Sequence, residues 1–134
     1  MKDEDWKNKL TDEQYKVLRK KGTEPPFSGE FLDHEAEGVY NCVACGNELF
    51  KSDTKYESTT PGLIGWPSFA EVIDSGSVLL KDDNTMGMQR TEVVCSKCGG
   101  HLGHLFDDET SPNGKHYCIN SVCLGFLPKT DSKP

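Results

Sequence analysis

The sequence holds two copies of the motif Cys-x-x-Cys-Gly, at residues 42–46 and 95–99. Each copy presents two thiolates from one tight turn, and the glycine relieves the backbone where the turn closes. Two such pairs form a tetrahedral set of four sulfurs, which suits Zn²⁺ and leaves no coordination position open for catalysis. The spacing therefore predicts a structural zinc site, while redox-active cysteines or an iron site of the rubredoxin type are the weaker alternatives. The predicted ligands are Cys42, Cys45, Cys95 and Cys98.

A metal in this position would join distant parts of the chain, because residues 46–94 separate the two cysteine pairs. That interval is longer than a local zinc ribbon contains. Only 34% of the residues are apolar and the mean hydropathy is −0.62, so the hydrophobic core is thin. Zinc binding at such sites contributes roughly 10–16 kcal/mol, which is enough to decide whether a chain of this kind folds.

The length and charge of the chain bound its organisation and its partners. With 134 residues we expect one domain, residues 1–134, in which a helix and a wrapping segment (1–30) precede a zinc-stapled β core (38–128). The net charge of −7 disfavours nucleic acid and anionic membrane surfaces, since both require a basic face. The acidic start MKDEDWKNKL is unlike a signal peptide, and no run approaches the roughly 20 apolar residues of a membrane span. We expect a cytoplasmic protein with reduced thiols, and nothing in the sequence demands more than a monomer.

Residues 11–22 predict the clearest helix. Thr11 and Gln14 have the spacing of a capping box, and Gly22 is expected to end the helix. Beyond residue 38, short apolar runs alternate with turns rich in Gly, Asp, Asn, Ser and Pro, which predicts a mainly β fold. Only residues 69–73 carry a hint of helical periodicity in this part. The predicted strands span residues 38–42, 48–52, 77–81, 90–95, 115–121 and 124–128.

Two cysteines, Cys118 and Cys123, lie outside the Cys-x-x-Cys-Gly motifs. His116 lies just before them, and the string HLGHLFDD adds His101 and His104. This cluster favours a thiolate made reactive by neighbouring imidazoles, with a carboxylate to orient one of the rings. The alternative is an ordinary pair of hydrogen-bonded histidines, or part of a second metal site.

Trp66 lies in the string GWPSF, before a proline that holds the tryptophan backbone extended. Most tryptophans in such a setting belong to the core. The alternative is an aromatic wall for a small apolar group of a ligand. The spacing alone favours the core position.

Taken together, these strings resemble those of the methionine-R-sulfoxide reductases, the MsrB family. The resemblance implies a β-tent of two antiparallel sheets (the Mss4-like fold), with structural zinc on the face away from the active site. It also implies an enzyme that reduces the R epimer of methionine sulfoxide. The substrate would be methionine sulfoxide in peptides or proteins, with the free amino acid as a second candidate. The matching segments, in order, are GTEPPFSG (22–29), GVYNCVACGNELFKS (38–52), GWPSF (65–69), RTEVVCSKCGGHLGHLFDD (90–108) and HYCINS (116–121).

The resemblance also assigns roles. The cysteine of the string HYCINS is expected to attack the sulfoxide and become a sulfenic acid, with its pKa lowered by polar and cationic neighbours. The asparagine of that string and the polar residues of HLGHLFDD would surround the reacting oxygen, and the tryptophan of GWPSF would hold the methyl group, which reverses the preference drawn from spacing. The expected catalytic residues are Cys118, His101, His104, Asp108 and Asn120, and the expected substrate-binding residues are Trp66, Phe106 and His116.

Two positions depart from the family pattern. His116 stands where many members have arginine, so a permanent cation is replaced by a titratable one. Ile64 stands where many members place a resolving cysteine, which leaves Cys123 as the candidate to reduce the sulfenic acid. Five residues of extended strand span roughly 16 Å, so a disulfide from Cys118 to Cys123 requires a turn at residues 120–122. The alternative is a buried, inactive Cys123 and direct reduction by an external thiol.

Two other functions compete with the reductase. A zinc-stapled binding module of the same fold, such as those that bind small GTPases, would have no use for HYCIN and HLGH. A small thiol oxidoreductase or peroxidase is disfavoured because four of the six cysteines match a metal site. The sequence therefore favours the reductase, with one structural Zn²⁺ and with thioredoxin or a similar thiol as reductant.

Overall fold

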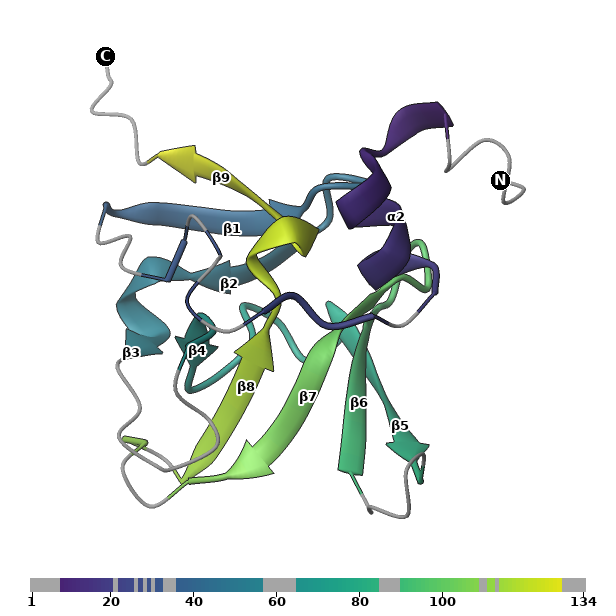
Figure 1. The fold of residues 1–134 in the computed structure, drawn as a ribbon. Helices are drawn as coiled ribbons and strands as arrows, with labels where there is room; N and C mark the ends of the chain where they lie inside the picture. The colour runs from purple at the N-terminus through teal and green to yellow at the C-terminus, as the bar shows by residue number, and fades with distance from the viewer. Residues whose placement is uncertain are drawn as a thin grey trace.

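The structure is a computed structural model that describes residues 8–20, 22–25, 27, 29, 31–32, 36–56, 65–84, 90–108, 111–112 and 114–128. These residues form two antiparallel sheets with a short helix beside them (Figure 1). The strand order is β2-β1-β9 in the three-stranded sheet and β3-β4-β8-β7-β6-β5 in the six-stranded sheet. The predicted fold class, a mainly β protein of two antiparallel sheets with a short N-terminal helix, is confirmed. Within the part of the chain described, no helix is long and apolar enough to cross a membrane.

The elements divide between the sheets as follows. The three-stranded sheet contains β1 (Gly38–Cys42), β2 (Glu48–Lys51) and β9 (Leu124–Pro128). The six-stranded sheet contains β3 (Lys55–Tyr56), β4 (Ser68–Phe69), β5 (Val78–Asp83), β6 (Arg90–Cys95), β7 (His101–Asp107) and β8 (Lys115–Ile119). The helical elements are α2 (Asp12–Leu18) and the 3₁₀ turns η1 (Ser52–Thr54) and η3 (Ser121–Cys123).

All six predicted strands form. The strands predicted at 38–42, 90–95 and 124–128 have those bounds in the structure, and the other three agree within two residues at each end. The hint of a helix at residues 69–73 is wrong. Phe69 belongs to β4, and the backbone N–H groups of Ala70 and Ile73 donate to Thr54 and Leu49 rather than to carbonyls one helical turn earlier.

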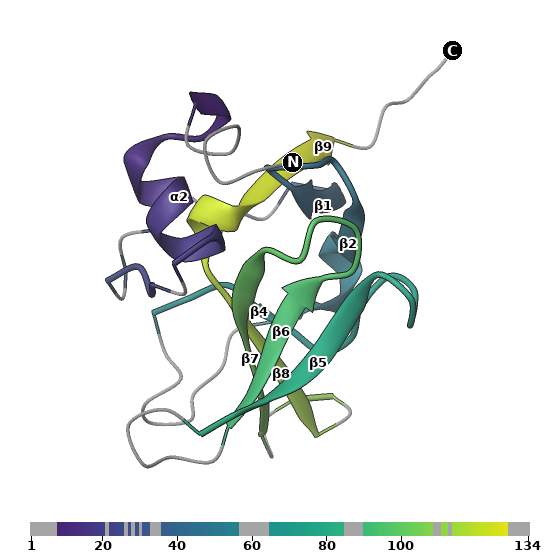
Figure 2. The same ribbon diagram turned by 90° about the vertical axis from the view of Figure 1, so that its right-hand side faces the viewer.

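Helix α2 begins as predicted and ends early. Thr11 Oγ1 accepts from Gln14 N at 3.2 Å, and Gln14 Oε1 accepts from Thr11 N at 2.9 Å, which is the predicted capping box. The helix ends at Leu18 with Arg19 as its C-cap, and not at Gly22. Gly22 still contributes to this end of the helix, because its N–H donates to the carbonyl oxygen of Lys16 at 2.9 Å. The Arg19 guanidinium donates to the carbonyl oxygen of Cys98 at 2.9 Å. Figure 2 shows α2 beside η3 and over one end of β7.

The core lies between the two sheets and is built from stacked aromatic rings. Phe50 of β2 stacks on Phe69 of β4 at 4.3 Å, and Tyr40 of β1 meets Phe69 edge-on at 5.1 Å. Tyr117 of β8 packs against Phe50 from the six-stranded sheet, and Ile119 is fully buried. Because side chains alternate along a strand, Cys118 between these two residues points to the opposite face of β8.

Candidate functional site

Four cysteines from the two Cys-x-x-Cys-Gly motifs meet at the junction of the two sheets. Their sulfur atoms all lie within 4.8 Å of one another. The distances are 3.8 Å between the sulfurs of Cys42 and Cys98 and 3.5 Å between those of Cys45 and Cys95. A tetrahedral ion with metal–sulfur bonds of about 2.3 Å places its sulfurs about 3.8 Å apart, so the arrangement fits a metal of that geometry. Cys42 ends β1 and Cys95 ends β6, so a metal here joins the two sheets.

The two motifs have nearly the same backbone. Gly46 and Gly99 take φ angles of 83° and 74°, and each donates its N–H at 2.8 Å to the carbonyl oxygen of the first cysteine of its motif. Positive φ is costly for residues with a Cβ, so the glycines are required by the turn. The predicted role of glycine in these motifs is confirmed.

Polar side chains surround the cysteine cluster. The Asn47 amide donates to the Ser77 carbonyl oxygen at 3.0 Å and to the Cys95 sulfur at 3.6 Å. Lys9 Nζ donates to the carbonyl oxygen of Ala44 in the first motif, and Arg19 donates to Cys98 in the second. Four thiolates around a divalent ion carry excess negative charge, which such donors and cations stabilise.

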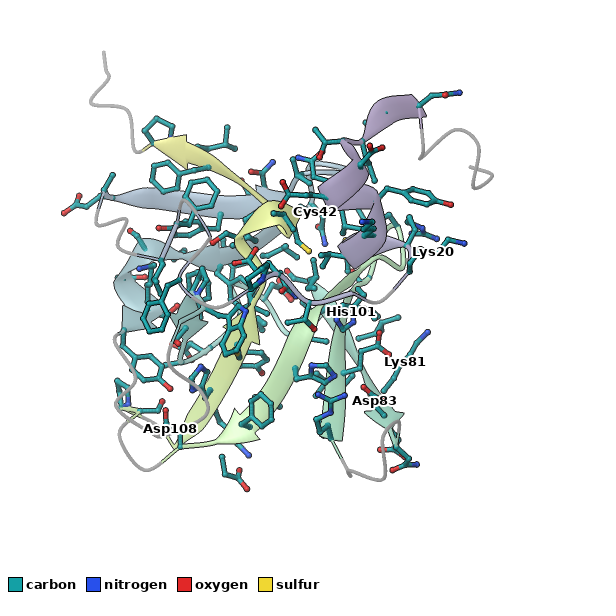
Figure 3. The ribbon with its side chains drawn as sticks, in the orientation of Figure 1. Lys20, Cys42, Lys81, Asp83, His101 and Asp108 are labelled. Carbon is teal, nitrogen blue, oxygen red and sulfur yellow. The ribbon has the colours of Figure 1, made fainter. Side chains whose placement is uncertain are left out.

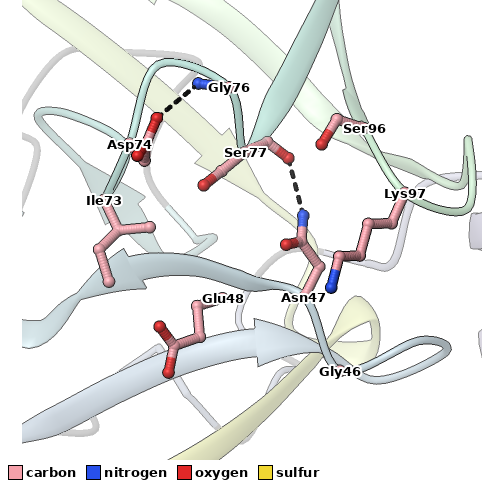
Figure 4. Close-up of a pocket in the computed structure, with 9 residues that line it drawn as sticks. All are labelled: Gly46, Asn47, Glu48, Ile73, Asp74, Gly76, Ser77, Ser96 and Lys97. Carbon is pink, nitrogen blue, oxygen red and sulfur yellow. Dashed lines mark hydrogen bonds between the residues drawn. The ribbon is translucent and has the colours of Figure 1, made fainter.

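A larger hollow of about 590 Å³ lies beside the first motif (Figure 4). Its charged residues are Glu48, Asp74 and Lys97, and the Asn47–Ser77 hydrogen bond crosses it. Among the residues that the structure describes, neither a histidine nor a cysteine lines this hollow. The hollow therefore lacks the groups that thiol chemistry requires.

A smaller cavity of about 130 Å³ gathers the predicted chemistry. Five of the expected site residues line it, whereas His101, Asp108 and His116 do not. The lining residues are Thr23, Trp66, Arg90, Gly103, His104, Phe106, Cys118 and Asn120. Trp66 is a wall of this cavity, so the preference for a core position that its spacing suggested is wrong.

Strand pairing brings the thiol and one imidazole together. Cys118 of β8 is the direct partner of His104 of β7, and His104 is the partner of Glu92 of β6. Direct partners have Cβ atoms about 4.5–5.5 Å apart and point to the same face. Gly103 permits this pairing, because a Cβ there would lie 1.9 Å from the carbonyl oxygen of Cys118.

A β-bulge brings the second histidine to the same face. Residues three apart on a regular strand point to opposite faces, which would separate His101 from His104. The register of β7 against β6 shifts after Val93, so that Val93 pairs with Gly103 and Val94 with His101. Leu102 is the extra residue, and the two imidazole rings meet edge-on at 5.3 Å.

Each of three histidines has a carboxylate partner. His101 Nδ1 lies 2.8 Å from Glu92 Oε2, and His104 Nε2 lies 2.8 Å from Asp83 Oδ2. His116 Nδ1 lies 3.0 Å from Asp108 Oδ2, which also accepts from the Tyr56 hydroxyl at 2.7 Å. Asp108, which the resemblance grouped with His101 and His104, thus lies in the pair with His116. In Figure 3, Asp83 and Asp108 lie toward the lower end of the six-stranded sheet and Cys42 lies toward the upper end.

His116 is buried and pairs with an acid. Burial lowers the pKa of His116, against the opposing effect of the Asp108 carboxylate. Its other ring nitrogen, Nε2, is buried and has no hydrogen-bond partner among the described residues. The residue that replaces the family's arginine is therefore no permanent cation.

Glu24, in the wrapping segment, ties two walls of the cavity together. Its carbonyl oxygen accepts from Trp66 Nε1 at 2.9 Å, and its N–H donates to Asn120 Oδ1 at 2.9 Å. Its own carboxylate is 3% exposed and accepts from Val122 N at 3.0 Å. The sequence gives no signal for this role beyond the resemblance of the whole GTEPPFSG string.

The Cys118 thiol is less acidic than the sequence predicts. Burial, followed by the charge of Glu24, raises the pKa of Cys118 to about 12. The expectation of a lowered pKa is wrong for the free protein, because burial and the Glu24 carboxylate both act against ionisation of the Cys118 thiol. Deprotonation of this thiol therefore requires a base within the cavity.

The second free cysteine, Cys123, is fully buried in η3. Its thiol donates to the carbonyl oxygen of His101 at 3.3 Å, and burial raises the pKa of Cys123 well above its ordinary value. The turn required at residues 120–122 is present as η3 (Ser121–Cys123). Ile64, where many family members place a resolving cysteine, lies outside the described residues.

Two antiparallel sheets closed by a four-cysteine centre, with a separate thiol in a small cavity walled by aromatic, imidazole and amide groups, define a cysteine-dependent protein of the β-tent class. A family model, the SelR domain, matches residues 10–128. A peptide methionine sulfoxide reductase MsrB of Methanosarcina mazei is 58% identical over 97% of this chain and 90% of its own. One of Leptospira interrogans is 54% identical over 92% of both chains. The mouse protein named methionine-R-sulfoxide reductase B3, mitochondrial, is 49% identical over 95% of this chain and 49% of its own length.

The chain therefore belongs to the SelR family of MsrB proteins, and the predicted family membership is confirmed.

Replacing Glu24 by glutamine tests the electrostatic part of the site. The substituted side chain keeps an oxygen for the Val122 N–H and removes the negative charge that raises the pKa of Cys118. The thiolate fraction then grows, and alkylation of Cys118 by iodoacetamide at pH 8 should become roughly threefold faster or more. Peptide mass spectrometry reports the rate at this cysteine alone.

The matched control is Glu48→Gln, which removes the same charge from an exposed position on β2. It should leave the alkylation rate of Cys118 unchanged. An unaltered or slower rate in Glu24→Gln would show that the carboxylate does not act on the thiol.

Proposed function

We propose that this protein reduces the R epimer of methionine sulfoxide to methionine with Cys118 as the nucleophile. One observation carries the proposal: the Cys118 thiol shares a cavity of about 130 Å³ with His104, Asn120, Trp66 and Phe106. The names of the relatives agree with it. No feature of the described residues favours the alternative, a non-catalytic binding module, which would not need a thiol in this setting.

Each wall of the cavity has a task in this reaction. Cys118 attacks the sulfoxide, methionine leaves, and the cysteine becomes a sulfenic acid. The His104 imidazole and the Asn120 amide lie where the sulfoxide oxygen gathers charge, and histidine exchanges protons near neutral pH. Trp66 and Phe106 offer an apolar surface to the methyl group. His101 supports His104 by ring contact, while Asp108 and His116 support the neighbouring strand ends.

The same walls explain the choice of epimer. A sulfoxide sulfur carries an oxygen, a methyl group and the rest of the substrate in a fixed handedness. When aromatic rings hold the methyl group and polar groups hold the oxygen, only one handedness presents the sulfur to Cys118. The other epimer would place its oxygen against apolar rings, which leaves a buried polar group without a hydrogen bond.

Zinc, a thiol reductant and a reducing compartment complete the proposal. Four cysteine sulfurs at tetrahedral distances suit Zn²⁺, and Cys42, Cys45, Cys95 and Cys98 would hold it as a structural ion. The sulfenic acid requires two electrons for turnover, which thioredoxin or a similar dithiol supplies. Six cysteines without a disulfide suit the cytoplasm.

Separated epimers of a blocked methionine sulfoxide test the activity. With dithiothreitol as reductant, the protein should convert the R epimer and leave the S epimer intact. Cys118→Ser should lose more than about a thousandfold of the rate, because the alcohol is a far weaker nucleophile. Methionine is measured by chromatography. Activity on the S epimer alone, or full activity without the thiol, would overturn the proposal.

The role of Cys123 is tested by turnover with thioredoxin. We expect Cys123→Ser to release one methionine per protein at the normal rate and to lose at least about tenfold in steady-state turnover. The wild type should show a Cys118–Cys123 disulfide by mass spectrometry after a single turnover. If thioredoxin drives full turnover of the variant, an external thiol reduces Cys118 directly and Cys123 is a core residue.

Removal of the metal tests the structural role. Emission spectrometry should find one zinc per chain, and a strong chelator should abolish the cooperative thermal transition. The reason is that a contribution of roughly 10–16 kcal/mol exceeds the usual stability of a domain of this size. Iron in place of zinc, or an unchanged transition after metal removal, would contradict this assignment.

A further inference from the structure

Asp83 is a buried carboxylate that has no task in the roles proposed above. It ends β5, is 8% exposed, and lies across the strand pair from Arg90. We propose that Asp83 is a positioning residue: it holds His104 in the tautomer and orientation that carry a proton from the Cys118 thiol to the sulfoxide oxygen. This inference rests on the proposed function and names the group that makes its chemistry work.

The contact between Asp83 and His104 determines which ring nitrogen of His104 carries the proton. An ionised carboxylate can only accept hydrogen bonds, so the ring nitrogen that it contacts must carry a proton. Asp83 Oδ2 lies 2.8 Å from Nε2 of His104. In the neutral ring this leaves Nδ1 with a lone pair, free to accept a proton. Asp83 therefore makes Nδ1 the basic nitrogen of His104.

The sheet sets the order of the three groups. Asp83 lies on β5, His104 on β7 and Cys118 on β8, with His104 and Cys118 as direct partners. His104 and Cys118 both line the cavity of about 130 Å³. A carboxylate, an imidazole and a thiol are thus in sequence across one face, the arrangement in which a base activates a nucleophile and a third group orients the base.

Charged groups from every neighbouring strand face His104. Asp83 comes from β5, Arg90 and Glu92 come from β6, His101 lies on β7 itself, and Cys118 comes from β8. Arg90 Nη2 lies 3.4 Å from the same Asp83 oxygen, which favours the ionised carboxylate. Glu92 is engaged by His101 at 2.8 Å. Asp83 is therefore the acid placed to act on His104.

The proton transfer balances without any further reactant. The Cys118 thiol gives its proton to Nδ1 of His104, which forms a thiolate and an imidazolium that Asp83 stabilises. The thiolate sulfur takes the oxygen as the sulfur–oxygen bond of the substrate breaks, and the Nδ1 proton moves to that oxygen. The products are methionine and Cys118 sulfenic acid, so the cysteine sulfur is oxidised and the substrate sulfur is reduced by two electrons.

The pair of Asp83 and His104 explains how a thiol that keeps its proton can still act as a nucleophile. The pKa of Cys118 is raised to about 12 by burial and by Glu24, so the thiol keeps its proton at neutral pH. A nearby base that receives the proton only when the substrate oxygen is present to accept it removes this obstacle. Both transfers use the one nitrogen that Asp83 leaves available.

The first test uses the wild-type protein alone. Nitrogen-15 NMR of the histidine rings distinguishes a protonated from a bare nitrogen in each of the four residues. We expect the neutral His104 ring to carry hydrogen on Nε2 and none on Nδ1. A proton on Nδ1 in the neutral ring would overturn the inference. This measurement does not depend on the folding of any variant.

The second test measures a single turnover of the R epimer in Asp83→Asn. We expect the maximal rate of methionine formation to fall roughly 10- to 100-fold with little change in the half-saturating sulfoxide concentration. Asp82→Asn is the matched control, since Asp82 is the exposed neighbour on β5, and it should retain the wild-type rate. Asp83→Glu should recover part of the loss because it restores a carboxylate.

A double-mutant cycle separates positioning from general damage. If Asp83 acts through His104, Asp83→Asn should add almost nothing to the loss caused by His104→Gln. A merely structural role would give independent, multiplying losses in the two variants, and that result overturns the inference. A normal rate in Asp83→Asn would also overturn the inference. So would a loss of rate in Glu92→Gln alone, because it would make His101, the partner of Glu92, the proton carrier. Failure of the wild type to reduce the R epimer would instead refute the proposed function.

Discussion

The junction of four cysteine sulfurs is the constraint on which the other features depend. One cysteine pair begins where β1 of the three-stranded sheet ends, and the other begins where β6 of the six-stranded sheet ends. A tetrahedral ion bound by these four sulfurs would fix the angle between the two sheets, which share a thin aromatic core. The N-terminal helix closes over the same junction through Arg19, and its Leu18 packs beside Gly100. The cysteine cluster holds the end of β6 at Cys95. Strands β7 and β8 pair in register from β6 outward, and this register places the Cys118 thiol.

Strand register, more than the course of any single loop, determines where the site residues lie. His104 and Cys118 are far apart in sequence and meet because β7 and β8 pair, and Gly103 lets the two strands approach. Asp83 reaches His104 from two strands away, across β6. Thr23, Trp66 and Asn120 line the cavity from outside the strands, and the backbone of Glu24 holds the last two. The other walls of the cavity lie on strands β6, β7 and β8.

The parts predicted from sequence are those with a local signal. The strands at 90–95 and 124–128 alternate or run apolar between clear turns, and the capping box at Thr11 lies within four residues. Strand β7 was not predicted, because Gly103 and the bulge at Leu102 interrupt its alternation. The two-residue strands β3 and β4 are too short for any pattern. The roles of Asp83 and Glu92 have no sequence signal because strand register sets their partners. The role of Glu24 has none because its partners Trp66, Asn120 and Val122 are distant in sequence and meet it only in the folded chain.

The acidity of Cys118 shows how far composition can mislead about a reactive residue. A cysteine among histidines suggests a standing thiolate, yet each imidazole near it is engaged by its own carboxylate, and the nearest charge that acts on the thiol is negative. Peroxides attack thiolates much faster than thiols, so a thiol that keeps its proton resists oxidation between substrates. A substrate that fills a cavity this small excludes water and brings its own proton acceptor, the sulfoxide oxygen. Under the proposed mechanism, the Cys118 thiol becomes reactive only with the substrate bound, when His104 can pass the thiol proton to the sulfoxide oxygen.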